Sequence, residues 1–486
     1  MRCEKRSRLA RTCLLKAVQA CLLFALITSS DANADRVKVL YKDEEASQAR
    51  VDLIRQAKSE LYISYFVVRD DASSLSGFVL LLDAADRGVE VKVIVDSFHL
   101  DIALPYIKAL IAHPNIQIRV YNRVSIFHLL RAFKRNHEKI ILADNIHTGD
   151  LHYLTGGRNV SDKYFGFGEQ RNFHDLDIYV HGRSAVQARD EYFLQQWDSE
   201  LVKDISLGPY SATNMEGVTC LKAKKEDDLC SRQIAKRKAA YQQALDDIGR
   251  RRQAMIAGQA AGVDWHLNTR WDLIAREVGE VKFLFDPPDT RKSDKGIATQ
   301  LYQIIVSDTS IKHLVILSPY VILTRRGAEL VTTLIKRGVD ITLVTNSLNS
   351  TDNLLAQAGY ANDKGWLLEQ GLRIFHYTGP DTIHAKAMII NDGESVLIGS
   401  YNFDPRSAKL NREVGVHFHA TNDKQGVVVD ELDEMLQYYL SSSLPIDRNG
   451  IAAGYDREHP NASTRKKILL NLLRPIVALP FIHRNL

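Results

Sequence analysis

The pattern of apolar and polar residues repeats along the chain. Short, nearly continuous apolar runs, typical of strands that are covered on both faces, are separated by stretches with helical periodicity. The runs form three matched pairs: 37–41 with 281–285, 61–66 with 313–318, and 89–95 with 339–344. In each half, the helical stretch before the third run ends at an Arg-Gly pair, where glycine is a common helix stop. The pattern predicts an α/β protein with two similar halves, each containing a βαβ unit.

Segments outside the repeat set the predicted domain boundaries. With 486 residues, the chain is too long for one ordinary domain. The expected order is a first half over 35–203, a connector over 204–275, a second half over 276–440 and a C-terminal tail over 441–486. The connector has a charged, helix-like stretch over 232–255, with arginines at 250–252. A solvated helix explains this charge run better than contact with anionic lipids.

The tail combines basic residues with an apolar stretch. Lys466 and Lys467 precede a run of leucine, isoleucine and valine that continues to Phe481 and is interrupted by Pro475 and Pro480. The run is too short and too broken to span a bilayer. Two interpretations fit it equally well: a segment that lies in the membrane interface, or a helix that packs on the protein.

The first 34 residues have the pattern of a targeting segment. Basic residues occur up to position 16, an apolar run follows over 17–27, and the small-residue triplet 32–34 comes next. We expect a signal peptide cleaved after Ala34; the alternative is an uncleaved membrane anchor. Both interpretations place the body of the protein outside the cytoplasm, in a bacterial periplasm or on the non-cytoplasmic side of a membrane.

Removal of residues 1–34 changes both the charge and the cysteine content. This segment holds six basic and two acidic residues, which account for the whole formal net charge of +4. The remaining protein is neutral, which argues against a nucleic-acid partner. Only Cys220 and Cys230 remain, and in an exported chain a disulfide is favoured over two buried thiols.

Two His-x-Lys motifs follow the βαβ units. His137 and Lys139 lie 100 residues after the first valine of their half, measured to the histidine, and His384 and Lys386 lie 103 residues after theirs. Residues two apart in a strand share a face, so each half projects one imidazole and one ammonium from an equivalent strand end. We expect the two sets to meet around a single phosphate.

The doubled motif, with its downstream residues, resembles the HKD signature of the phospholipase D superfamily. Each motif is followed by a Gly-Gly-x-Asn or Gly-Ser-x-Asn sequence, at 156–159 and 399–402. The resemblance covers nearly all of 37–440 and is greatest to bacterial cardiolipin synthases. It implies two αβα sandwich halves with mixed sheets, packed about a pseudo-twofold axis.

The resemblance also implies the roles of the motif residues. In this family one histidine attacks phosphorus and the other serves as acid and base, which would make His137 the nucleophile and His384 the acid/base; the residues alone do not decide between them. The residues expected to bind the phosphoryl oxygens or to shape their pocket are Lys139, Lys386, Asn159, Asn402, Gly157 and Ser400. No metal or other cofactor is expected.

Acidic residues near the motifs are assigned supporting roles. Each histidine needs an acceptor for its second ring nitrogen, and the matching positions are Asp175, with Asp177 as a weaker candidate, and Glu413. The family's motif also ends in an aspartate, which Asp144 provides in the first half. In the second half, that position is Asn391, with Asp392 next to it. We expect a structural effect of this departure and no loss of activity.

The sequence leaves several functions open. A phosphatidyltransferase of the cardiolipin-synthase type, acting on phosphatidylglycerol or phosphatidylethanolamine at a membrane surface, fits the motifs best. A phospholipase D that releases phosphatidic acid would use the same residues, with water as the acceptor. An exported endonuclease and a catalytically silent binding module are less favoured, because the protein without its N-terminal segment is neutral and both motifs are intact.

Overall fold

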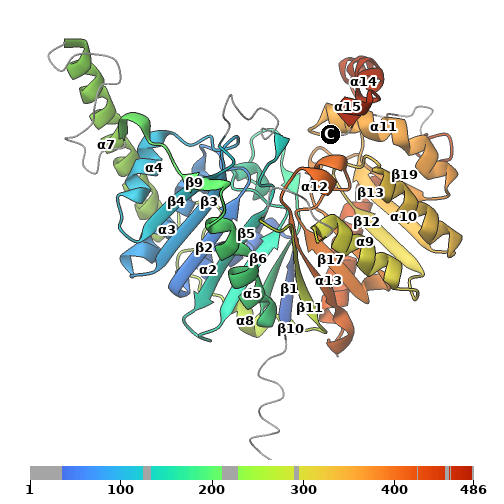
Figure 1. The fold of residues 1–486 in the computed structure, drawn as a ribbon, viewed down its shortest axis with the longest axis horizontal. Coiled ribbons are helices and arrows are strands. Elements are labelled where there is room, and N and C mark those ends of the chain that lie inside the picture. Colours follow the sequence, from blue (N-terminus) through green and yellow to red (C-terminus); the bar gives the residue numbers. More distant parts are fainter. Residues whose placement is uncertain are drawn as a thin grey trace, which may run out of the picture.

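The computed structural model consists of two α/β halves, shown side by side in Figure 1. The structure describes residues 35–123, 133–210, 228–288, 295–423, 425–454, 459 and 461–483. The predicted signal peptide over 1–34 and Cys220 therefore lie outside the described residues. Cys230 is buried, and its disulfide stays a prediction.

The first half is a nine-stranded mixed sheet with helices packed on it. Its strands are β1 (Arg36–Leu40), β2 (Ala57–Tyr65), β3 (Glu90–Asp96), β4 (Ile116–Tyr121), β5 (Lys139–Asn145), β6 (Leu151–Gly156), β8 (Asp177–His181), β9 (Val202–Asp204) and β10 (Arg276–Glu277). Its helices include α2 (Asp43–Arg55), α3 (Ala72–Asp86), α4 (Leu104–Ile111), α5 (Arg183–Gln187) and α6 (Leu194–Trp197).

The second half repeats this plan with eight strands. These are β11 (Val281–Phe285), β12 (His313–Leu317), β13 (Asp340–Asn346), β14 (Arg373–Tyr377), β16 (Ala387–Ile390), β17 (Ser395–Gly399), β18 (Val414–His419) and β19 (Ser443–Ile446). The helices are α9 (Ile297–Ser307), α10 (Arg325–Lys336), α11 (Leu354–Glu369), α12 (Pro405–Lys409) and α13 (Val427–Ser441).

The strand orders confirm the predicted duplication. The first sheet runs β10-β1-β8-β6-β5-β2-β3-β4-β9 and the second β11-β18-β17-β16-β12-β13-β14-β19, so the sheets match strand for strand apart from the added β10. β2 and β3 are parallel, as are β12 and β13, which gives the expected βαβ units. Helices α3 and α10 stop before Gly88 and Gly338, whose positive φ angles of 94° and 80° suit glycine alone among common residues.

The two halves share one core and exchange a short ribbon. One large apolar cluster contains Val37 and Tyr153 from the first half and Phe283 and Val416 from the second. In addition, β7 (Phe173–His174) of the first half pairs in parallel with β15 (Thr382–Ile383) of the second. Because the apolar core continues across the seam, its burial holds the halves in a fixed relation.

The connector contains the predicted charged helix, α7 (Asp228–Ile256), followed by the short α8 (Trp271–Ile274). Each of the three arginines at 250–252 contacts a polar or acidic side chain. Arg251 donates to the Ser76 hydroxyl at 2.8 Å, Arg252 lies 3.2 Å from Asp86, and Arg250 pairs with Asp247. These contacts agree with a solvated helix laid on α3 and α4 (Figure 1).

The second sheet extends beyond the expected boundary at residue 440. β19 comes from the predicted tail, yet it pairs with β14 as the edge strand of the sheet. The first residues of the predicted second half belong instead to the first sheet, because β10 (Arg276–Glu277) pairs with β1. The tail then forms α14 (Thr464–Val477) and α15 (Pro480–His483). In the described part of the chain, no helix has both the length and the apolarity needed to cross a bilayer.

Candidate active site

The His-x-Lys motifs lie at equivalent positions on the central strands of the two sheets. Lys139 is the first residue of β5, and Lys386 immediately precedes β16, the equivalent strand. His137 and His384 stand two residues earlier, at the strand ends that face the other half. All four side chains are buried. The sequence therefore located both motifs correctly on strand ends.

A backbone bridge across the seam places His137 beside a carboxylate of the second half. The His137 amide donates to the Arg412 carbonyl at 2.9 Å. The next residue, Glu413, accepts a hydrogen bond from Nδ1 of His137, with 2.9 Å between Nδ1 and Oε2. This arrangement fixes the ring tautomer that keeps Nε2 unprotonated and able to act as a nucleophile.

His384 of the second half makes the same two kinds of contact with residues of the first half. Its amide donates to the His174 carbonyl at 2.7 Å, and the next residue, Asp175, accepts from Nδ1 of His384 at 2.5 Å. Asp175 and Glu413 are thus the two acceptors that the sequence identified. Sequence order suggests that each carboxylate serves the histidine of its own half, but the structure exchanges them, because each carboxylate follows the strand end that crosses the seam.

The weaker candidate, Asp177, has a different role. Its carboxylate accepts from the guanidinium groups of Arg50 at 2.8 Å and Arg158 at 3.0 Å, all three side chains being buried. Arg158 also pairs with Asp43 at 2.9 Å. This closed ion-pair network satisfies the charges locally, so Asp177 is not an acceptor for a motif histidine.

Each carboxylate is held by further contacts. Glu413 accepts from the hydroxyls of Ser400 at 2.5 Å and Ser407 at 2.7 Å, and from the Asn411 amide at 3.2 Å. Asp175 packs against Gly157, where an added Cβ would lie 1.9 Å from its Oδ1. Ser400 and Gly157 therefore support the carboxylates, a role that differs from the substrate binding predicted for them.

Burial keeps both imidazoles neutral. It lowers the pKa of His137 to about 3, against the opposing effect of Glu413, with Lys139 adding to the decrease. Burial and the charge of Lys386 lower the pKa of His384 as well. Burial acts to raise the pKa of Glu413, but the charge and hydrogen bond of His137 bring the net pKa below its usual value. The site at rest therefore offers two neutral rings beside two ionised carboxylates.

The two lysines put positive charge next to both rings. Lys386 Nζ lies 3.2 Å from Nε2 of His384, and Lys139 Nζ donates to the His137 carbonyl at 2.5 Å. Burial and the charge of Lys386 together lower the pKa of Lys139 to about 7, and burial lowers the pKa of Lys386 to about 8. Because the charge of Lys386 lowers the pKa of Lys139, the two ammonium groups repel each other, and a bound anion would stabilise both.

The two motif asparagines differ in their contacts. Asn159 is engaged by the protein, since its oxygen accepts from the Val67 amide at 3.1 Å and its amide donates to the Tyr164 hydroxyl at 2.9 Å. The side-chain oxygen of Asn402 is buried with no hydrogen-bond partner among the described residues. Of the two, Asn402 is better placed to contact a ligand, because a buried polar atom without a partner is costly.

The final residue of each motif is structural. Asp144 accepts from the backbone amides of Lys58, Ser59 and Glu60 at 3.0, 2.8 and 2.9 Å, at the far end of β5 from His137. Asp144 therefore makes structural contacts away from the motif histidines and lysines, in agreement with the supporting role expected for it. These bonds tie β5 to the start of β2.

Asn391 provides the same tie in the second half. Its side-chain oxygen accepts from the amides of Lys312 and His313 at 2.8 and 3.3 Å, at the start of β12. An amide oxygen can accept these bonds as a carboxylate does, so Asn391 makes in the second half the contacts that Asp144 makes in the first. Asp392, in contrast, sits in the following turn with a φ angle of 57°.

Aromatic residues around the histidines escaped the sequence analysis. The Phe66 ring packs edge-on against His137, with 4.7 Å between centroids, and Tyr164 and Phe173 pack on His384 at 5.3 and 5.2 Å. These rings exclude water from the imidazoles. Tyr164 lies in the segment that follows the first Gly-Gly-x-Asn sequence, but no spacing rule marks Phe66 or Phe173.

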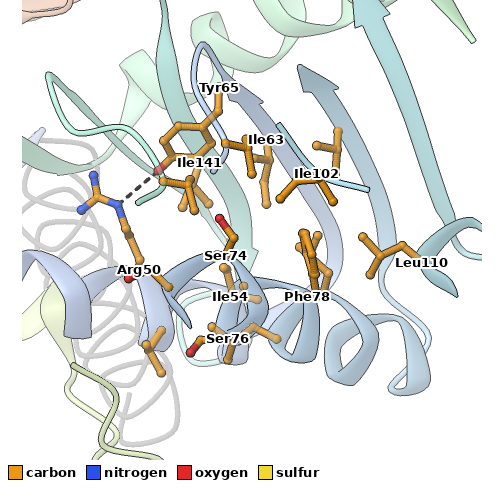
Figure 2. Close-up of a pocket in the computed structure, with 18 of the residues that line it drawn as sticks. Arg50, Ile54, Ile63, Tyr65, Ser74, Ser76, Phe78, Ile102, Leu110 and Ile141 are labelled. Atoms are coloured by element: carbon orange, nitrogen blue, oxygen red, sulfur yellow. Dashed lines mark hydrogen bonds between the residues drawn. The ribbon is translucent and has the colours of Figure 1, made fainter. Parts of the chain in front are cut away.

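The first half also contains an apolar cavity that is separate from these groups. It lies between the sheet and helices α2 and α3, lined by residues such as Ile54, Ile63 and Phe78 (Figure 2). The hydrogen bond from Arg50 to the Tyr65 hydroxyl, 3.1 Å long, borders it. No motif histidine or lysine lines this cavity, so it is not the catalytic site.

Two sheets of matching order, with a His-Lys pair at each central strand and carboxylates exchanged across the seam, define a phospholipase D-like protein. The family described as "Cardiolipin synthase, PLD-like domain" matches residues 51–197 and 305–438, more than half of the chain. The chain therefore belongs to the phospholipase D-like cardiolipin synthase family.

Individual relatives and a solved structure agree with this assignment. Cardiolipin synthase C of Escherichia coli (strain K12) is 28% identical over 464 residues, covering 89% of this chain and 90% of that protein. A cardiolipin synthase of Geobacillus sp. (strain WCH70) is 23% identical, covering 85% of this chain and 68% of that protein. The crystal structure of phosphatidylserine synthase from Haemophilus influenzae Rd KW20 has the same fold, with a TM-score of 0.60 at 16% identity, covering 93% of this chain and 95% of that one.

Proposed function

We propose that this protein is a phosphatidyltransferase of the cardiolipin-synthase type that works through a phosphohistidine intermediate. One observation carries the proposal: two neutral imidazoles, each with Nδ1 bonded to a carboxylate of the opposite half, stand beside two buried lysines. The substrate class is supported by the relatives, which are named cardiolipin synthases.

In the first step, Nε2 of His137 attacks the phosphorus of a phospholipid and the bond from phosphorus to the headgroup oxygen breaks. The leaving alkoxide takes a proton from His384. That ring is neutral in the resting site, in part because of the charge of Lys386 beside it, and a bound phosphodiester anion offsets this charge and favours protonation of the ring. Lys139, Lys386 and Asn402 stabilise the charge on the phosphoryl oxygens.

In the second step, an acceptor alcohol replaces the headgroup. Neutral His384 takes the proton from the acceptor hydroxyl, whose oxygen forms the new bond to phosphorus as the bond to His137 Nε2 breaks. Phosphatidylglycerol as acceptor and phosphatidylglycerol or phosphatidylethanolamine as donor would yield cardiolipin. Water in the same place would yield phosphatidic acid, so exclusion of water by Phe66, Tyr164 and Phe173 favours transfer.

The test incubates the full-length protein with vesicles of phosphatidylglycerol and phosphatidylethanolamine and identifies the lipid products. We expect cardiolipin from the unmodified chain and from His147→Ala, whose ring lies in an exposed turn, and none from His137→Ala. Phosphatidic acid as the sole product would establish a hydrolase, and cleavage of DNA without any lipid product would establish a nuclease.

The assignment of the nucleophile needs a separate measurement. Because His384 serves both steps, the donor for this test is a phosphatidyl ester with a nitrophenol leaving group, which needs no protonation. With it, His384→Ala should slow only the second step, and mass spectrometry should find a phosphatidyl adduct on His137. An adduct on residue 384 in the His137→Ala protein would reverse the two roles.

We also propose that the protein acts outside the cytoplasm, on the basis of the targeting pattern over 1–34. Fractionation of a bacterium that produces the full chain, with N-terminal sequencing, tests this proposal. Recovery of the unprocessed protein from the cytosol would contradict it.

A further inference from the structure

The end of the chain forms a helix with two different apolar faces. α14 lies against α11 at the outer edge of the second half, and α15 follows it (Figure 1). One face of α14 is docked: Leu470 and Val477 are buried in a small cluster with Leu348, Ala358 and Ala361. This face accounts for the attachment of the helix.

Polar contacts hold the docked face in place. Arg474 Nε donates to the side-chain oxygen of Asn362 at 3.1 Å. The side-chain nitrogen of Asn362 in turn donates to the Arg474 carbonyl at 3.0 Å. At the other end of α14, Lys466 Nζ donates to the carbonyls of Leu348 and Asn349 at 3.1 and 2.8 Å. The orientation of α14 is therefore fixed.

The opposite face is apolar and uncovered. Large exposed side chains gather there and on α15: Ile468, Leu469, Leu472, Ile476, Leu479 and Phe481. The described part of the chain has eighteen large exposed apolar side chains, and these six fall within fourteen consecutive residues. They therefore form a contiguous patch. Leu472 is 62% and Phe481 69% exposed. At 3.6 residues per turn, the four of these residues that lie in α14, from Ile468 to Ile476, fall within an arc of roughly 100°.

The charge around this face has one sign. Residues 461–483 contain four basic side chains, Arg465, Lys466, Lys467 and Arg474, and no acidic one. Lys466 and Arg474 contact the protein on the docked side, and Arg465 and Lys467 carry the remaining positive charge of the segment. An apolar face on a segment with only positive charge suits the boundary between anionic lipid headgroups and acyl chains. A protein partner or a second copy would have to provide a complementary acidic rim.

The docked face also connects α14 to the catalytic seam. The segment over 348–351, which accepts the bonds of Lys466, receives bonds from Arg171 as well, with 3.1 Å to the Asn349 carbonyl and 2.9 Å to the Ser350 carbonyl. The Thr382 hydroxyl donates to the Ser350 carbonyl at 2.5 Å. Thr382 and Arg171 closely precede His384 and Asp175, so the docked face of α14 is linked through this segment to the ribbon that carries the site.

We propose that the uncovered face of α14 and α15 lies in the plane of an anionic lipid bilayer and holds the catalytic seam at its surface. The proposal rests on the proposed function in one respect: it assumes a substrate that resides in a membrane. Lipid binding is measurable without turnover, so either idea fails independently of the other.

The first test measures insertion of the face itself. Leu472→Trp and Leu273→Trp replace two leucines of similar exposure, 62% and 65%, in α14 and α8. With vesicles of phosphatidylglycerol that contain brominated acyl chains, we expect quenching of the added fluorescence at position 472 and none at position 273. Equal behaviour at both positions overturns the proposal, even if the protein binds the vesicles elsewhere.

The second test removes the apolar character. Leu472→Asp combined with Ile476→Asp should weaken co-sedimentation with phosphatidylglycerol vesicles on the order of tenfold or more, because an interfacial helix binds through its buried apolar area. The matched control is Leu273→Asp with Ile146→Asp, which changes the charge equally on exposed residues elsewhere. Turnover of a short-chain, water-soluble phospholipid should be unchanged in both.

Several outcomes would overturn the proposal. They are unchanged vesicle binding in the α14 variant, an equal loss in the control, and a wild-type dimer that the α14 variant converts to monomers with no effect on vesicle binding. The last result, from analytical ultracentrifugation, would assign the face to a second copy of the chain. Thermal unfolding of each variant identifies any loss that comes from misfolding.

Discussion

Glu413 of the second half accepts the Nδ1 hydrogen bond of His137 from the first half, with 2.9 Å between the two atoms. Asp175 and His384 repeat the relation in the opposite direction. Each half therefore holds one imidazole and the carboxylate that orients the other, so neither half contains a complete pair. This dependence gives a physical reason for the fixed seam between two halves of the same topology.

Replacement of Glu413 by glutamine tests its role as a positioning residue. The amide keeps the shape but no longer favours the correct tautomer of His137, so kcat should fall on the order of 10²- to 10⁴-fold while KM changes little. Glu434→Gln, at an exposed residue that accepts from Tyr41, is the control and should retain full activity. A parallel loss of kcat and thermal stability, rescued when the enzyme is assayed at lower temperature, would indicate a purely structural role.

Gly157→Ala should impair catalysis by displacing Asp175. The added Cβ would lie 1.9 Å from the carboxylate oxygen, so the Asp175–His384 bond must break or shift. Gly77→Ala, at a helical glycine with no atom within 4 Å of the added Cβ, should leave turnover unchanged and is the matched control. Comparison of kcat for the two variants checks the prediction, and equal turnover would contradict it.

The ties made by Asp144 and Asn391 should affect stability and leave chemistry intact. Asp144→Ala leaves three backbone amides without their acceptor, and we expect a loss of about 2–3 kcal/mol in the free energy of unfolding. Asn391→Asp should alter stability little, since either side chain supplies the oxygen. Denaturant unfolding gives both values, and the rate per folded molecule should match that of the unmodified protein.

Low pH should weaken the hydrogen bonds made by Asp144 and leave those made by Asn391 unchanged. Burial acts to raise the pKa of Asp144, but the hydrogen bonds from Glu60 and Ser59 outweigh it and hold the pKa below its usual value of 3.8. A depressed folded-state pKa stabilises the protein above the unfolded value, and this contribution disappears as pH falls through the folded value. Asp144→Asn should therefore flatten the stability profile below about pH 4. An unchanged acid profile would contradict this account.

Anion binding should take up protons near pH 8. Burial lowers the pKa of Lys139 to about 7 and that of Lys386 to about 8, whereas a bound anion favours the charged ammonium groups and raises both. Sulfate, which keeps its charge over this range, should therefore bind more weakly at pH 9 than at pH 7, on the order of tenfold or more, since both lysines lose their protons. Calorimetry in buffers of different ionisation enthalpy measures the uptake, which Lys139→Met should reduce. Binding with no proton exchange would mean that the lysines are already charged in the empty site.

The sequence by itself predicted the duplication, the βαβ units, the two His-x-Lys motifs and the identity of both carboxylates. These features are local: buried strands need continuous apolar runs, helix ends need glycine, and residues two apart in a strand share a face. The same pattern could not assign Asp175 and Glu413 to their histidines, because their proximity in space depends on strands that cross the seam.

The tertiary structure alone decided three further points. It made Asn391 the equivalent of Asp144, it placed Ser400 and Gly157 behind the carboxylates, and it gave α14 a docked face and an uncovered one. Each depends on which distant segment packs against the residue. An apolar pattern indicates that a side chain is buried. It does not indicate which segment covers that side chain, because this depends on the packing of the whole chain.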